Sequence, residues 1–154
     1  MDADQLAETW NIHNRIQLYL LAAIPDEALS AVAGPKTRNV HDLFAHIHNV
    51  RLMWLKSAAP ELLAGIDKIE TKQISSRAAL TTALASSGLA MEKLLRQSAA
   101  SGRVKGFKPH VVAFLGYIIS HESHHRGQIT WALKLSGHPL DQKTSFGLWE
   151  WGVR

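Results

Sequence analysis

The chain contains no cysteine among its 154 residues. This absence excludes disulfide bonds, thiolate metal sites and a cysteine nucleophile, and it agrees with a reducing cytoplasm, where we expect the protein. Long hydrophobic runs are also missing, because the stretch from Val111 to Ile119 is only about half of the ~18 residues that a membrane helix needs. The acidic first residues lack the basic-then-apolar order of a signal peptide. We therefore expect no membrane segment.

Positive charge is present but is not concentrated in one place. The net charge is +4, and the densest basic group is Arg103, Lys105 and Lys108. A nucleic-acid-binding surface would need a stripe of basic residues with aromatic residues between them. We therefore expect no nucleic-acid partner. The length and the hydrophobic content of 46% fit a single globular domain over residues 1–154.

No strand pattern stands out, whereas helical periodicity recurs four times. The predicted helices run from about Asp4 to Ala23, from Asn39 to just before Pro60, from Ser76 to Ala99 and from Pro109 to Ser136. Asn39 is a good N-cap residue, and Gly137 followed by Pro139 suits the end of the last helix. Gly88 weakens the middle of the third helix. The pattern predicts an all-α four-helix bundle, with an aromatic tail that packs over one end or against a second subunit.

Histidine is the most informative residue type, with nine copies in the chain. His121 and His125 are four residues apart on the apolar stripe of the fourth predicted helix, so their side chains share one face and could chelate one transition metal. A third ligand has to come from another helix. The second predicted helix offers His46 and His48, which are about 200° apart around its axis, so only one of them can face the pair. Periodicity alone does not decide between them.

The same segment also spells His121-Glu122-Ser123-His124-His125, which matches the His-Glu-x-x-His signature of zinc proteases. In those enzymes the glutamate is the general base beside the metal. The match covers only five residues, no third histidine follows at the usual spacing, and no strands are predicted to align a peptide. A zinc hydrolase is therefore the least favoured of the metal-dependent functions.

Three segments together resemble the DinB superfamily. The run from Leu43 to Ile47, followed by Trp54 and Leu55, looks like its second-helix motif of a leucine, a histidine and a tryptophan-leucine pair. The run from His121 to Gln128 closely resembles its fourth-helix motif, and Trp10 with Asn14 and Arg15 resembles its first helix. The similarity covers most of the chain.

The resemblance implies a four-helix bundle, often a homodimer, with a divalent metal held by His46, His121 and His125. His48 has no counterpart in the motif and is the reserve ligand. Three imidazoles suit zinc, nickel or iron, and they leave a coordination position open. Some relatives are thiol-dependent S-transferases or isomerases, which implies a small-molecule thiol and an electrophilic substrate as partners. The alternative is a non-catalytic metal-binding or stress-response protein, with its pocket closed.

Overall fold

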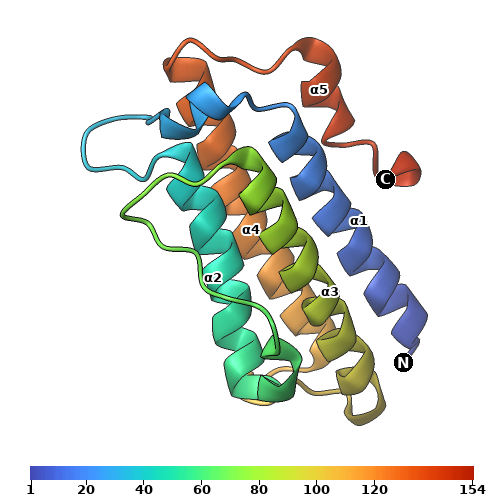
Figure 1. Ribbon diagram of the computed structural model, residues 1–154. Coiled ribbons are helices and arrows are strands. Elements are labelled where there is room, and N and C mark those ends of the chain that lie inside the picture. Colours follow the sequence, from blue (N-terminus) through green and yellow to red (C-terminus); the bar gives the residue numbers. More distant parts are fainter.

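A computed structural model describes residues 1–154 and shows four long helices packed side by side (Figure 1). The long helices are α1 Ala3–Ala22, α2 Val40–Ala58, α3 Arg77–Ser101 and α4 Val111–Leu135. Four short helical segments lie between and after them, η1 Asp26–Ser30, η2 Pro60–Leu63, α5 Gln142–Gly147 and η3 Trp151–Val153. The prediction of an all-α fold with four long helices is confirmed.

Each long helix begins where a side chain caps the free backbone N–H groups of its first turn. The capping residues are Asp2, Asn39, Ser76 and His110. The predicted start of the fourth helix at Pro109 is too early, because His110 is the cap and its Nδ1 accepts from the Ala113 N–H at 3.2 Å. The third helix also runs two residues further than predicted, to Ser101. It ends at Gly102, whose φ of 71° is the left-handed conformation that glycine adopts without strain.

Helices α2 and α3 run in the same direction, so the connection after η2 has to travel back along the whole bundle (Figure 1). Polar side chains of α2 make hydrogen bonds to this crossover connection. His48 Nε2 lies 2.8 Å from the carbonyl oxygen of Asp67, and the Asn49 amide makes two hydrogen bonds of 2.9 Å with the Ile69 backbone. The connection is therefore held against α2 by hydrogen bonds between α2 side chains and its own backbone.

The interior consists of two apolar clusters stacked along the bundle axis. One cluster contains Ile16, Leu20, Phe44, Leu84 and Ile129 among its members, and the other contains Trp10, Leu55, Met91, Phe114 and Ile118. Between them lies a polar layer to which every long helix contributes fully buried side chains, among them His13, Arg51, Ser87 and Glu122. The candidate functional site lies beside this layer.

The C-terminal tail folds back onto α1 (Figure 1). The Arg154 guanidinium stacks 3.7 Å from the centre of the Tyr19 ring, and Arg15 donates a 3.0 Å hydrogen bond to the carbonyl oxygen of Arg154. Trp149 stays largely exposed. The tail thus packs on α1, and its contact with a second subunit stays a prediction. No helix is both long enough and apolar enough to cross a membrane.

Candidate metal centre

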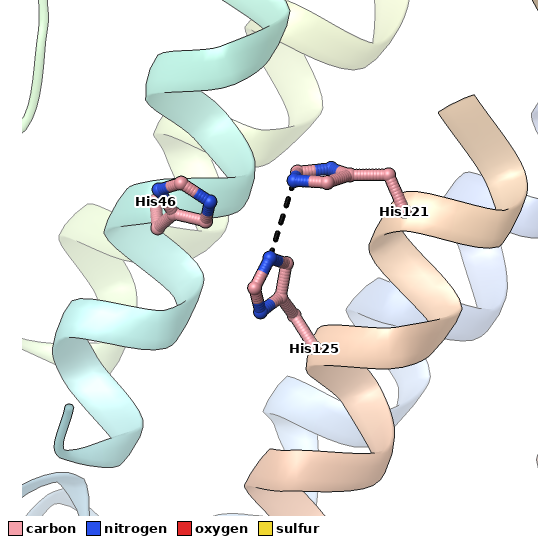
Figure 2. Close-up of side chains that lie close together, drawn as sticks. All are labelled: His46, His121 and His125. Carbon is pink, nitrogen blue, oxygen red and sulfur yellow. Dashed lines mark hydrogen bonds between the residues drawn. The ribbon is translucent and has the colours of Figure 1, made fainter. Parts of the chain in front are cut away.

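Three histidines from two helices point toward one another (Figure 2). His46 comes from α2, and His121 and His125 come from consecutive turns of α4. One ring nitrogen from each of the three lies within 4.8 Å of the others. The ring centre of His46 lies 5.3 Å from the ring centre of His121 and 4.6 Å from that of His125. The structure therefore brings together the three residues that the resemblance implied.

The dimensions of this cluster fit a transition metal. Imidazole nitrogens bound at ~2.1 Å around one tetrahedral ion lie roughly 3.3 Å apart. His121 Nε2 and His125 Nε2 are already 3.1 Å apart, and His46 needs only a small movement to close the set. His46 and His121 are partly exposed, so an ion held here would be reachable from solvent.

A neighbouring amide fixes the orientation of His125. Its Nδ1 lies 2.7 Å from Oε1 of Gln128, one turn further along α4. Because a carbonyl oxygen only accepts, Nδ1 carries the proton and Nε2 presents its lone pair to the other two histidines. Metal-bound histidines are commonly oriented in this way by a hydrogen bond to the second ring nitrogen.

The environment keeps all three imidazoles neutral. Burial, followed by the nearby positive charge of Arg38, lowers the pKa of His46 from 6.5 to about 4. Burial is also the main cause that lowers the pKa of His121 and of His125. Neutral imidazole is the form that binds metal, so the three histidines could hold an ion at neutral pH.

The remaining member of the zinc-protease signature points away from this cluster. Glu122 is fully buried and accepts hydrogen bonds from Arg51 Nη2 at 2.8 Å and from His13 Nε2 at 2.7 Å. Burial opposes ionisation of Glu122, but the charge and hydrogen bonds of Arg51 outweigh it and hold the pKa of the carboxyl far below its usual value. Glu122 is thus committed to the polar layer, and the protease arrangement is not formed.

His48 does not belong to the cluster. Its Nδ1 lies 3.0 Å from the hydroxyl of Ser87, its Nε2 contacts the crossover connection, and its side chain is fully buried. Both ring nitrogens are therefore already in use. His124 is exposed beside His125 on the outer surface of α4.

Arg51 lies in the core, which was not predicted from the sequence. Arg51 is fully buried and binds Glu122, the carbonyl oxygen of Leu84 and the Ser87 hydroxyl. A signal was present, because Arg51 follows Ile47 and precedes Leu55 at four-residue steps and so lies on the apolar stripe of α2. A charged residue at such a position requires an opposite charge on a facing helix.

The family model described as "DinB family" matches residues 1–145. The chain belongs to the DinB family. The match extends over all four long helices and therefore includes the three clustered histidines. No curated protein matches the chain.

Membership of the DinB family agrees with the fold and with the resemblance drawn from the three motifs. In this DinB protein, Asn14 of the first-helix motif packs against α3, and its amide lies where a side chain at Gly88 would otherwise be. Trp10 donates a 2.8 Å hydrogen bond to the Gly88 carbonyl oxygen. These two motif residues therefore join α1 to α3.

Proposed function

We propose that this DinB protein is a metal-dependent enzyme in which His46, His121 and His125 bind one divalent transition metal. The observation that carries the proposal is the convergence of three neutral ring nitrogens within 4.8 Å of one another. Zinc, nickel and iron all accept three imidazoles, and three protein ligands leave a position open. The Gln128 bond to His125 supports the proposal, because it aims a lone pair into the cluster.

We further propose that the substrates are a small-molecule thiol and an electrophile. A divalent ion bound at the cluster would lower the pKa of the thiol, so that a thiolate nucleophile forms at neutral pH. The chain has no cysteine of its own, so the reacting sulfur would come from the cosubstrate. The three histidines would hold their neutral form throughout, and the polar layer would fix the position of α4 relative to α2.

The partial exposure of His46 and His121 favours this function over a non-catalytic metal protein. A closed structural site would bury all its ligands. The aromatic tail, which could have closed the pocket, instead packs on α1. A cytoplasmic location and a homodimer are part of the same proposal and rest on the sequence alone.

Elemental analysis of the purified, untagged protein tests the metal site. We expect about one equivalent of zinc, nickel or iron per chain, and loss of that metal in the triple variant His46→Ala/His121→Ala/His125→Ala. His138→Ala is the matched control, because His138 is exposed and lies beyond the end of α4. A triple variant that keeps its full metal content would refute the site.

Turnover separates the two functions. Conjugation of a small thiol to an aromatic halide should occur with the metal-loaded protein and should be abolished in His121→Ala. If His121→Ala only lowers the melting temperature, and the loaded wild type shows no turnover with a panel of thiols and electrophiles, the protein is a non-catalytic metal binder.

A further inference from the structure

A cationic cleft lies directly beside the three-histidine cluster. Its volume is about 640 Å³, and its lining includes Lys36, Thr37, Arg38, Gln128 and Trp131. The first three belong to the loop before α2, and the last two belong to the C-terminal half of α4. The lining includes two cationic side chains and no carboxylate.

The cleft and the cluster are continuous along both helices. Leu43, which also lines the cleft, precedes His46 by three residues on α2. Gln128 follows His125 by three residues on α4 and touches its ring at 2.7 Å. One helical turn rises about 5 Å, so the near rim of the cleft lies roughly that distance from the histidine rings. A small molecule bound at the histidines can therefore reach into the cleft.

The two cations of the cleft have no anionic partner in the protein. Neither Lys36 nor Arg38 takes part in any salt bridge. The charge of Arg38 nevertheless acts on the cluster, since it contributes to the lowered pKa of His46, His121 and His125. An anion placed in the cleft would gain two charge-assisted contacts without breaking an existing one.

The loop that carries these cations has a defined conformation. Lys36 adopts a φ of 61°, which is uncommon for a residue other than glycine. The Thr37 hydroxyl closes the turn by donating a 2.7 Å hydrogen bond to the carbonyl oxygen of Gly34. Asn39 then caps α2, so the loop leads directly into the helix that bears His46. The backbone of the loop thus holds Lys36 and Arg38 at a defined place relative to α2.

We propose that this cleft recognises a carboxylate group on the thiol cosubstrate, with Arg38 and Lys36 as the binding residues. The inference rests on the proposed function, because the sulfur of the same molecule would lie at the three-histidine site. The substrate would be an acidic thiol in which several bonds separate the sulfur from the carboxylate. Trp131, which is more than half exposed, would cover the aliphatic part between the two ends.

Cobalt(II)-loaded protein tests the proposal through a spectroscopic signal that does not depend on turnover. Binding of a thiolate to cobalt(II) produces a sulfur-to-metal charge-transfer band, which can be titrated. The probes are 6-mercaptohexanoate and 6-mercaptohexanol, which have the same chain length and differ in the terminal charge. We expect the acid to bind about tenfold more tightly than the alcohol to wild type, and this preference to fall as salt is raised.

The double variant Lys36→Gln/Arg38→Gln should bind cobalt but lose the preference for the acid. The matched control is Lys56→Gln/Lys105→Gln, which removes the same charge from two exposed residues at the opposite end of the bundle. If wild type binds cobalt and both thiols equally, the cleft proposal is wrong and the proposed function stands. If wild type takes up no cobalt, the proposed function itself fails, and the cleft proposal fails with it.

Discussion

His46 and His48 are two residues apart on α2, and the structure gives them opposite surroundings. His46 is partly exposed and faces the two histidines of α4, whereas His48 is fully buried with both ring nitrogens hydrogen-bonded. A side chain that serves as a ligand contributes to metal affinity, while one that fastens a connection contributes to folding. Substitutions of the two histidines should therefore affect different quantities, metal affinity for His46 and folding stability for His48.

We expect His46→Ala to abolish metal binding while changing the stability of the metal-free protein little. His48→Ala should keep the metal but destabilise the fold by about 2–3 kcal/mol, because it removes two hydrogen bonds and leaves a cavity. Urea unfolding of the metal-free proteins and metal titration of the folded proteins measure the two effects. The opposite result, with metal lost from His48→Ala alone, would make His48 the ligand.

Gln128 offers a test of how the orientation of His125 affects the site. Gln128→Ala removes the acceptor for His125 Nδ1 and should weaken metal binding about 10–100-fold with little loss of stability. Gln128→Glu should retain the affinity, since a carboxylate oxygen also accepts that hydrogen bond. Gln97→Ala, an exposed glutamine on α3, is the control. Equal affinity in Gln128→Ala and wild type would show that the bond does not orient the ligand.

The contact between helices α1 and α3 depends on one glycine. A Cβ atom at Gly88 would lie 2.2 Å from the Asn14 side-chain nitrogen, so the two helices meet through an amide that occupies the place of a missing side chain. Alanine at this position would favour the helix by up to about 1 kcal/mol if there were room for it. The benefit is blocked by Asn14, which is 8% exposed and packed at the interface.

A double-mutant cycle tests this packing. Gly88→Ala should fail to stabilise the wild-type protein, or should destabilise it, because Asn14 has to move. In an Asn14→Ala background the same substitution should stabilise by up to about 1 kcal/mol, since the space is then free. Thermal and urea unfolding of the four proteins give the coupling energy. Identical effects of Gly88→Ala in both backgrounds would mean that the two residues do not interact.

The number and approximate bounds of the helices could be predicted because apolar periodicity, caps and stop signals are local properties of the sequence. Gly88 shows the limit of such reasoning: in isolation it weakens a helix, and only the facing Asn14 explains it. Periodicity likewise could not decide whether His46 or His48 faces the two histidines of α4. The family motif indicated His46. The parallel direction of α2 and α3 depends on a long connection without a helical pattern, so the sequence did not indicate it.

The buried polar layer divides the core and ties all four long helices together. Arg51 of α2, Glu122 of α4, His13 of α1 and Ser87 of α3 form one hydrogen-bonded group between the two apolar clusters. His121 adjoins Glu122 along α4, so the layer that sets the spacing of the helices also sets the spacing of the three clustered histidines. Stability and metal affinity should consequently respond together to pH.

The metal-free protein should lose stability as the pH falls from about 7 to 4. The folded-state pKa of His46 is about 4 against 6.5 unperturbed, and those of His121 and His125 are also lowered, so the unfolded chain binds protons that the folded chain does not. The stability contributed by these neutral histidines is fully present above pH 6.5 and is lost as the pH falls through the folded pKa values. Glu122, whose pKa is lowered from 4.5, adds a further loss below that value.

Thermal melts of the metal-free protein between pH 7.5 and 4 measure this effect. His46→Gln should give a shallower decline of the melting temperature over the interval from 6.5 to 4, because one of the groups that distinguish the folded from the unfolded chain is gone. His138→Gln, at an exposed position away from the cluster, should follow wild type.

With metal bound the decline should be steeper than in the metal-free protein, since protons then also compete with the ion for the three nitrogens. A melting temperature that is constant across this range would show that the histidines are not held neutral by their surroundings. Equal slopes of melting temperature against pH for wild type and His46→Gln would show the same. The cluster would then have no advantage over exposed histidines in binding metal at mildly acidic pH.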